Sequence, residues 1–252
     1  MPTPYDDAAL YDRLFDGLTF DVDFYHRLAI EAGGPALDVG CGTGRVLLPL
    51  WDRGLSVDGW EPSPAMLARL RAKALAAGHA PRLFGGDLGA LPETPRYGLA
   101  FFAFNAFAHN LTSQSQLDIL RRLRTCLHER GCLAIGAGHP PFSDWAAPTV
   151  DPSPVLEMET TPDANGLRLR LLDTRRLDPI GLIQHSTITI EEVDSYGVVV
   201  AAHQSTTTLR WLFQPEFELL LRCAGFQRVE FFGGYDGEAR VSDAQPLIVV
   251  AR

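Results

Sequence analysis

The feature that most constrains this chain is the stretch ALDVGCGTGR, residues 36–45. A short apolar run leads into Asp38, and Gly40, Gly42 and Gly44 follow within a few residues. Glycines this dense let a backbone turn sharply and come close to a ligand. The residues that follow are predicted to be helical, so the loop also lies at a helix N-terminus, where free N–H groups face outward. The pattern predicts a nucleotide-type binding site.

Apolar patterns on both sides of this loop alternate between strand and helix periods. Strands are predicted over residues 35–40, 56–61, 81–87, 97–105 and 132–138, and helices over residues 5–17, 22–32, 44–54, 63–78 and 113–131. This alternation through short connections predicts a parallel sheet with helices on both faces. A helix over 214–225 and strands over 227–233 and 246–252 end the chain. The last two strands are joined by a loop without a helical pattern, so we expect an antiparallel hairpin at the sheet edge.

The alternation breaks after Gly138. Residues 139–154 are rich in proline and are predicted to be a loop, and three extended segments follow over 167–177, 182–193 and 197–213. The turns between them are too short for parallel crossovers, so these segments predict an antiparallel meander. We therefore expect an N-terminal helical cover over 1–34, an α/β domain over 35–140 and 214–252, and a β insert over 141–213. The insert fits either a cover over a substrate or the surface of a homodimer.

Four residues of the insert are candidates for lining an acceptor pocket, namely Trp145, Arg175, His185 and Trp211. Strand alternation places Ser205, Thr207, Leu209 and Trp211 on one face of the insert. That face fits packing on the rest of the chain or on a second subunit.

Composition excludes several other kinds of protein. The formal net charge is −9 and Lys73 is the only lysine, whereas proteins that grip a phosphate backbone carry a basic stripe, so we expect no nucleic-acid partner. The most apolar stretch, residues 97–109, is too short to cross a bilayer, and the acidic N-terminus lacks a signal-peptide core. The four cysteines form no CxxC pair and have no histidine at ligand spacing. We expect a cytoplasmic protein with reduced thiols, no membrane contact and no metal site.

Two cofactor classes use a glycine loop of this kind. A dinucleotide fingerprint has the order G-x-G-x-x-G, but here Arg45 stands in the place of the third glycine. Asp38 precedes the loop and would lie badly beside a pyrophosphate, whereas it suits a ligand with a positive charge. Asp38 also fits a simpler role as a cap of the turn.

Three stretches, LDVGCGTGR, VDGWEPSPAML and FGGDLGALP, resemble the class I S-adenosylmethionine-dependent methyltransferases. The resemblance covers about residues 36–138 and 214–252. It implies an α/β fold with a Rossmann-like, seven-stranded, mostly parallel sheet and an antiparallel C-terminal hairpin. It also implies S-adenosylmethionine as the cofactor and, through the N-terminal segment and residues 209–226, a branch that acts mostly on small molecules.

The same resemblance assigns roles to individual residues. The glycine loop packs against the methionine part of the cofactor, Glu61 binds both ribose hydroxyls, Asp87 binds the adenine amino group and Met66 covers the adenine face. Glu61 also makes sense chemically, because a carboxylate at the end of a parallel strand can accept from two hydroxyls at once. The expected cofactor-binding residues are Asp38, Gly40, Cys41, Gly42, Gly44, Glu61, Pro62, Met66, Asp87, Leu88 and Asn105. Asp87 also fits a plain turn before Gly89.

Methyl transfer from a sulfonium is an in-line displacement in which the protein mainly aligns the reactants and excludes water. A base is needed only if the acceptor must lose a proton. His109 and His139 are the base candidates, because histidine titrates near neutral pH. Tyr11 is the third catalytic candidate, since the resembling branch folds an N-terminal tyrosine over the cofactor, and Tyr5 is a secondary one. Each of these side chains also fits a purely structural role.

The sequence thus predicts an enzyme that transfers a methyl group from S-adenosylmethionine to an N or O atom of a small-molecule acceptor. Residues 105–108 read Asn-Ala-Phe-Ala, where methyltransferases of nucleobase amines often carry a D/N-P-P-Y/F motif. An NAD(P)-dependent oxidoreductase, a non-catalytic S-adenosylmethionine-binding protein and a methyltransferase of RNA or protein remain as alternatives.

Overall fold

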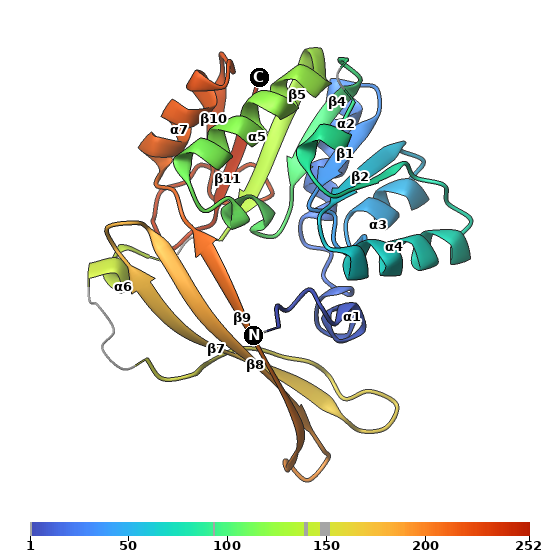
Figure 1. Ribbon diagram of the computed structural model, residues 1–252, viewed down its shortest axis with the longest axis vertical. Helices are drawn as coiled ribbons and strands as arrows, with labels where there is room; N and C mark the ends of the chain where they lie inside the picture. The colour runs from blue at the N-terminus through green and yellow to red at the C-terminus, as the bar shows by residue number, and fades with distance from the viewer. Residues whose placement is uncertain (1, 93, 139–140, 147–151) are drawn as a thin grey trace.

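Seven strands form the central sheet of the computed structural model, which describes residues 2–92, 94–138, 141–146 and 152–252. Their order is β10-β11-β5-β4-β1-β2-β3. Five strands of this sheet run parallel to one another: β1 (Ala36–Val39), β2 (Val57–Glu61), β3 (Leu83–Gly85), β4 (Tyr97–Phe102) and β5 (Leu127–Ala137). β11 (Leu247–Ala251) runs antiparallel to β5 and to the edge strand β10 (Val229–Phe232), which confirms the predicted hairpin (Figure 1).

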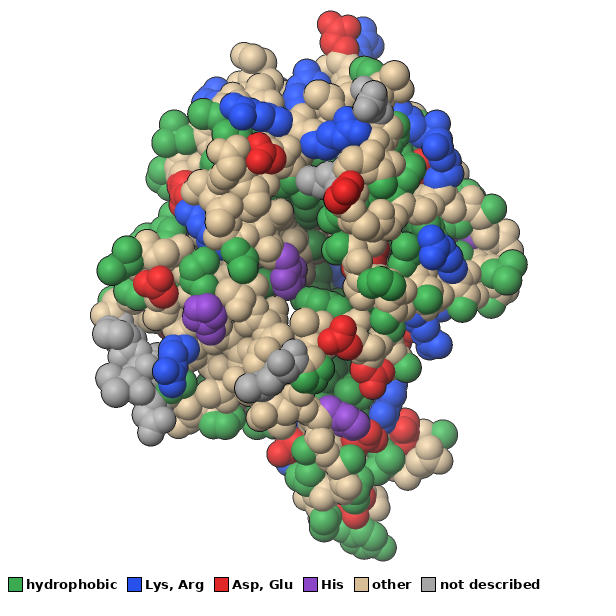
Figure 2. Space-filling model, viewed as in Figure 1, with side chains coloured by type: hydrophobic (Ala, Val, Ile, Leu, Met, Phe, Trp, Pro, Cys, Tyr) green, Lys and Arg blue, Asp and Glu red, His purple; other side chains and the backbone are tan. Residues whose placement is uncertain are grey.

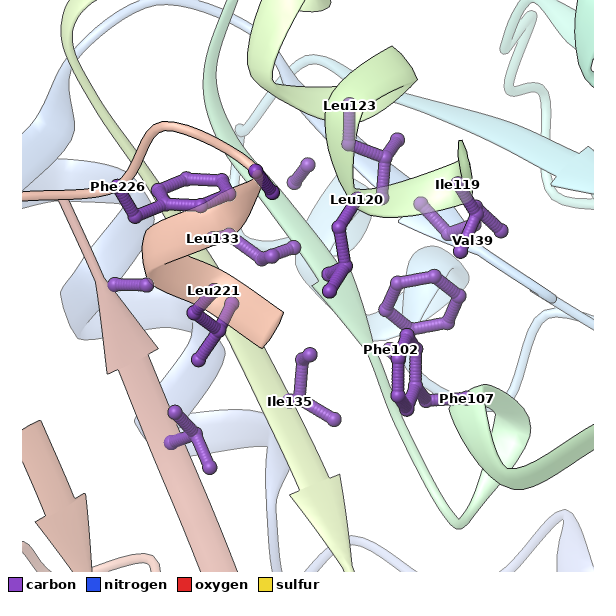
Figure 3. Close-up of a cluster of buried hydrophobic side chains, with 14 of the residues drawn as sticks. Val39, Phe102, Phe107, Ile119, Leu120, Leu123, Leu133, Ile135, Leu221 and Phe226 are labelled. Atoms are coloured by element: carbon purple, nitrogen blue, oxygen red, sulfur yellow. The ribbon is translucent and has the colours of Figure 1, made fainter. Parts of the chain in front are cut away.

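Helices cover both faces of this sheet. One face carries α2 (Val22–Ala32), α3 (Leu47–Asp52) and α4 (Pro64–Ala76), and the other carries α5 (Ser113–Cys126) and α7 (Gln214–Cys223). The fully buried strand β4 serves both, because alternate side chains point to opposite faces: Leu99 packs with the α2 cluster and Ala100 with the α5 cluster. Figure 3 shows Leu120 of α5 and Leu221 of α7 within the second cluster, over Ile135 of β5.

The predicted helix over 113–131 is too long. It ends at Cys126, and Leu127 already begins β5, paired with Tyr97 of β4. A register irregularity between Tyr97 and Leu99 accommodates this early start. The sequence Leu-His-Glu-Arg at 127–130 continues a helix-like pattern of polar and apolar residues, so local propensity does not reveal the change. Pairing with β4 decides it.

A second sheet of four antiparallel strands follows β5 in the chain. Its order is β6 (Val155–Glu159), β7 (Arg168–Asp178), β8 (Ile183–Val193) and β9 (Val199–Arg210). The three predicted segments correspond to β7, β8 and β9, whereas β6 and the short helix α6 (Phe142–Ala146) were missed. α6 lies within the proline-rich stretch 139–154 and β6 begins directly after it, and the composition of that stretch predicts a loop. In Figure 1 this sheet lies below the ends of the central strands.

The N-terminal segment joins the two sheets. Helix α1 (Ala8–Phe15) buries Leu10 and Leu14 against Leu169 and Ile190 of the second sheet. A short 3-10 helix after β4, η2 (Ala106–His109), also packs there through Ala108, and a second one, η1 (Leu88–Ala90), follows β3. Within the described part of the chain, no helix has the length and apolar character needed to cross a membrane.

Candidate functional site

A cavity of about 730 Å³ lies between the carboxyl ends of the central strands and the second sheet. Its walls come from the glycine loop after β1, the turn after β2, the turn after β4, the N-terminal residues and the inner face of β7, β8 and β9. Open α/β sheets bind their ligands at this end of the strands. Figure 2 shows the surface hollowed between the two halves of the molecule.

The glycine loop turns as the sequence predicts. Gly40 and Gly42 adopt φ values of 77° and 54°, a left-handed region that favours glycine. The N–H groups of Gly40 and Cys41 both donate to the Trp60 carbonyl of β2, at 2.7 and 3.1 Å. Burial raises the pKa of the Cys41 thiol well above its ordinary value, so the thiol is protonated and unreactive.

Glu61 ends β2 and is held firmly by backbone groups. Its Oε2 accepts from Gly42 N–H and its Oε1 from Ser63 N–H, both at 2.8 Å. The side chain is only 7% exposed, and burial raises its pKa above the ordinary value, although the two backbone donors oppose that shift. Each carboxylate oxygen retains a lone pair, so the group can still accept from two ligand hydroxyls.

Asp38 is the next-to-last residue of β1, just before the glycine loop. It is 2% exposed, lines the cavity, and its Oδ1 has no hydrogen-bond partner among the described residues. Burial raises the pKa of Asp38 well above its ordinary value, and the carboxyls of Asp21 and Glu61 add to the rise while the Arg45 cation opposes it. An ammonium group in the cavity would satisfy this buried oxygen. The residues present therefore fit the ligand that the sequence predicts.

Arg45 has its own partner. Its guanidinium forms two 2.7 Å hydrogen bonds with the carboxylate of Asp21 and one of 2.8 Å with the Leu18 carbonyl. Sequence reasoning missed Asp21, which is fully buried. The sequence contains two signals for this ion pair. An acid directly precedes the second predicted helix, and an arginine stands in a loop whose predicted ligand has no phosphate for it to bind.

The predicted adenine side of the site is only partly assembled around the cavity. Pro62 and Met66 line it, and Met66 is almost fully buried. Asp87 is exposed and does not line it, and its Oδ1 accepts from Gly89 N–H at 2.8 Å, as a turn residue would. Leu88 begins η1. The assignment of Asp87 and Leu88 to adenine stays a prediction.

The turn after β4 is strained where it meets the cavity. Phe104 and Asn105 are consecutive non-glycine residues at φ 49° and 66°, a conformation that costs free energy and clusters at functional sites. The Asn105 amide oxygen accepts from Gly138 N–H at 2.6 Å, which ties this turn to the end of β5. Asn105 thus shapes the cavity wall and also lines it.

The three catalytic candidates differ in their position and in their protonation state. The His109 ring lies at the cavity with its Nε2 2.7 Å from the Tyr5 hydroxyl, and the surrounding protein desolvates it and lowers its pKa. Tyr11 also lines the cavity, and burial raises its pKa to about 12, so it is a protonated phenol at neutral pH and no base. His139 lies outside the described residues.

The second sheet supplies the remaining wall. Of the residues that the sequence places on one face of β9, Ser205, Thr207 and Leu209 line the cavity. The four residues predicted to line an acceptor pocket do not line this cavity, so the prediction was wrong for Trp145, Arg175, His185 and Trp211. Two physical reasons account for this. The tryptophans are buried in a separate apolar cluster with Leu209 and Ala108, whereas Arg175 pairs with Asp173 and Glu157, and His185 is exposed beside Thr208.

The second sheet also contributes cavity-wall residues that were not singled out from the sequence. Leu171, Ile188 and His203 lie on β7, β8 and β9, respectively, and their alternation was too regular to mark one face as the functional one. Among the described residues, no group of three or more His, Cys, Asp or Glu side chains could hold a metal ion.

Comparisons with known proteins identify a methyltransferase domain in this chain. Residues 36–131 match the family described as "Methyltransferase domain". The uncharacterized methyltransferase YrrT of Bacillus subtilis is 30% identical over 136 residues, which cover 51% of this chain and 62% of that protein. The chain thus spans less than two thirds of the length of this curated relative.

Solved structures resemble the chain over nearly its whole length. The CcbJ methyltransferase from Streptomyces caelestis has a TM-score of 0.75 at 24% identity, covering 99% of this chain and 98% of that one. The sugar N-methyltransferase KedS8 from a Streptoalloteichus species has a TM-score of 0.72 at 18% identity, covering 100% and 93%. These likenesses extend the fold match to the second sheet. The chain thus carries a methyltransferase domain over residues 36–131, and its sheet order and glycine loop are those expected from the class I S-adenosylmethionine-dependent methyltransferases that it resembles.

Proposed function

We propose that this protein transfers the methyl group of S-adenosylmethionine to an N or O atom of a small molecule. The observation that carries the proposal is the grouping, around one cavity, of the Glu61 and Asp38 carboxylates with the His109 ring. When bound, the cofactor supplies a methyl group on a positively charged sulfur, which is already activated for displacement. The chain's own residues then have to bind, orient and keep water out.

The donor side needs groups that hold ribose and an ammonium. Glu61 is oriented by Gly42 and Ser63 before any ligand arrives, so it accepts the two ribose hydroxyls without reorganisation. Asp38 has an unpartnered buried oxygen that an ammonium would satisfy. Met66 and Pro62 supply apolar contacts for the adenine ring of the cofactor, and the glycine loop lets the backbone approach its methionine part.

The acceptor side lies toward the second sheet. Leu171 and Ile188 make an apolar wall there, and Ser205 and Thr207 add hydroxyls that can orient a polar molecule. The enclosed volume lies in the range of small-ligand pockets. In this proposal the second sheet covers the acceptor. The size of the cavity supports a small-molecule acceptor, and one structural neighbour is a sugar N-methyltransferase.

His109 serves as the base when the acceptor must lose a proton. Its lowered pKa keeps the imidazole neutral at neutral pH, so a lone pair is available on the ring. An amine acceptor must lose its proton before or after methyl transfer, and an alcohol must lose it during the transfer. Either chemistry suits the site.

The oxidoreductase alternative fits the cavity less well. Arg45 is the one lysine or arginine among the described lining residues, and Asp21 already neutralises it. Beside it stand the carboxylates of Asp38 and Glu61, which would repel the pyrophosphate of a dinucleotide. The same charge pattern weakens an RNA substrate.

The direct test has two stages. Calorimetry with S-adenosylmethionine, and with NAD and NADP as controls, should give binding for the first ligand alone. A panel of amino sugars, other amines and alcohols is then incubated with cofactor that carries a labelled methyl group. Label in a product supports the proposal. Binding of NAD or NADP in place of S-adenosylmethionine would overturn it, and cofactor binding with no transfer across metabolite pools would favour the non-catalytic alternative.

A further inference from the structure

Tyr5 lies where the three walls of the cavity meet. It belongs to residues 2–7, which we call the N-terminal strap. Hydrogen bonds hold the strap at Pro2 and at Tyr5. Thr206 N–H of β9 donates to the Pro2 carbonyl at 3.0 Å, and Ser63 Oγ donates to the Tyr5 carbonyl at 3.2 Å. The Tyr5 hydroxyl is 2.7 Å from His109 Nε2. Its phenol therefore has a defined position in the cavity.

The hydroxyl has partners on two sides. One is the His109 ring on η2, against which the Tyr5 ring also packs edge-on, with centroids 5.2 Å apart. The other is the Thr207 side chain of β9, which lies near enough to the phenol to oppose, as a hydrogen-bonding group, the rise of the Tyr5 pKa. Tyr5, His109 and Thr207 all line the cavity, so a ligand can reach the phenol oxygen from within. A phenol oxygen can donate one hydrogen bond and accept others at the same time.

The protonation states of Tyr5 and His109 decide which of the two side chains donates the hydrogen bond between them. Burial raises the pKa of Tyr5, and the nearby Tyr11 of α1 and Glu61 of β2 add to the rise, so the phenol keeps its proton. Desolvation lowers the pKa of His109, so the imidazole is neutral and has one nitrogen lone pair. The arrangement that uses both states has the Tyr5 O–H donating to His109 Nε2. The free lone pairs of the phenol oxygen are then directed to Thr207 and the cavity.

We propose that Tyr5 is the catalytic residue that receives the acceptor's proton, and that it relays its own proton to His109, which acts behind it. This inference rests on the proposed function, and it moves the contact with the acceptor from the histidine to the tyrosine. Thr207 is then a positioning residue, because it directs the phenol oxygen without touching the reacting atoms.

The relay conserves atoms and charge. The acceptor's N–H or O–H bond breaks and its proton joins the phenol oxygen, while the phenol O–H bond breaks and that proton joins Nε2. The acceptor's lone pair forms the new N–C or O–C bond, and the electron pair of the broken C–S bond stays with sulfur. The phenol ends unchanged, and His109 ends as the imidazolium, which solvent then deprotonates.

The relay also links the two halves of the site. Ser63 donates its N–H to Glu61 Oε1 and its hydroxyl to the Tyr5 carbonyl. The residue that orients the predicted ribose-binding carboxylate therefore also fixes the strap that carries the phenol. Placement of donor and base would be set by one residue.

The first experiment uses the protein without ligands. Nitrogen NMR of labelled histidine reports which ring nitrogen of His109 carries the proton and follows its titration. We expect an unprotonated Nε2 in the wild type at neutral pH. In Tyr5→Phe the pKa of His109 should rise, because the lost O–H had stabilised the neutral ring. A protonated Nε2 in the wild type, or an unchanged pKa in the variant, would overturn the relay.

The second experiment measures turnover with an acceptor from the labelled-methyl panel. Tyr5→Phe should lower kcat by about 100-fold or more, in line with loss of proton-transfer catalysis, while affinity for S-adenosylmethionine is kept. His109→Asn should do the same, and the double variant should be no slower than either single one, since both interrupt one chain. The matched controls are Tyr196→Phe and His185→Asn, whose side chains are exposed and do not line the cavity.

The pH profile separates a relay from a structural latch. In the wild type kcat/KM should fall as the pH drops below the pKa of His109, because the ring must be neutral to take the proton. This fall of kcat/KM at low pH should vanish in Tyr5→Phe. Retained turnover in Tyr5→Phe, or additive losses in the double variant, would overturn the relay. A wild-type protein that does not bind S-adenosylmethionine would instead overturn the proposed function, and the NMR result on the pair would be unaffected.

Discussion

Arg45 and Asp21 form a two-pronged ion pair in the interior, with Nη1–Oδ1 and Nη2–Oδ2 distances of 2.7 Å. Neither side chain is more than 7% exposed, and the guanidinium also lies over the rings of Phe20 and Phe104, at 5.4 and 5.2 Å. The pair therefore joins the segment before α2 to the segment before α3 at the wall of the cavity, which Arg45 lines. The arginine that replaces a fingerprint glycine acts as a structural clamp.

Breaking this clamp should destabilise the fold. Asp21→Asn keeps the side-chain volume but leaves Arg45 as a buried, uncompensated charge, for which the expected loss in free energy of unfolding is about 3–5 kcal/mol. Urea unfolding measures it as a lower midpoint with an unchanged slope. The control is Asp23→Asn, which removes the exposed contact with Arg53 and should change stability little. Equal effects of the two substitutions would contradict the clamp.

Glu61 gives a prediction about affinity. Glu61→Ala removes a carboxylate that accepts from two backbone N–H groups and, in our proposal, from two ribose hydroxyls. Hydrogen bonds to a charged group contribute about 1.5–3 kcal/mol each, so S-adenosylmethionine binding should weaken by a few kcal/mol at most. Calorimetry on a variant shown to be folded measures this, with Glu218→Ala on the exposed side of α7 as the control. Unchanged affinity in Glu61→Ala would remove Glu61 from the cofactor site.

Much of the fold was predictable because its signals are local. Alternating periods place the central strands, Ser63 caps α4 as its position before Pro64 suggests, and the helix-free loop before residue 247 predicts the closing hairpin. Prediction from the sequence failed where pairing with another strand, and not the local sequence, decides the structure. Leu127 joins a strand because β4 is beside it, and β6 forms beside β7 although prolines precede it.

The candidate site follows the same division. Asp38 and Glu61 could be chosen from the sequence, since they stand at strand ends whose position in a parallel sheet is known in advance. The contact between Tyr5 and His109 spans 104 residues, and no local pattern encodes it. The wall from β7, β8 and β9 was equally hidden, because alternation defines two faces but not which face meets the rest of the molecule.

Asp38 predicts a pH dependence of cofactor binding. Burial raises its pKa in the free protein, so part of the population is protonated at a pH where an exposed aspartate would be ionised. An ammonium beside it favours the ionised form, so binding should release a proton and tighten as the pH rises through that raised pKa. Above it the affinity should level off.

The measurement is calorimetry in buffers of different ionisation enthalpy. Asp38→Asn should release fewer protons than the wild type and should bind S-adenosylmethionine more weakly. Glu61, whose pKa burial also raises, accounts for any release that remains. Affinity for methylthioadenosine, which has no ammonium, should hardly change. Equal proton release in the wild type and in Asp38→Asn would contradict the role given to Asp38.

The close contact at Gly40 makes the last prediction. An alanine Cβ there would lie 2.9 Å from Ala106 Cβ, and the residue has a φ of 77° that side chains disfavour. Gly40→Ala must therefore push the glycine loop or η2 aside, and we expect S-adenosylmethionine binding to fall below detection. Gly54→Ala is the matched control, because Gly54 has a similar φ of 84° with nothing within 4 Å of the added atom. The control should show only backbone strain of about 1–2 kcal/mol in urea unfolding, with cofactor affinity intact. If both variants bind the cofactor equally well, the close packing of the loop against η2 is not what shapes the site.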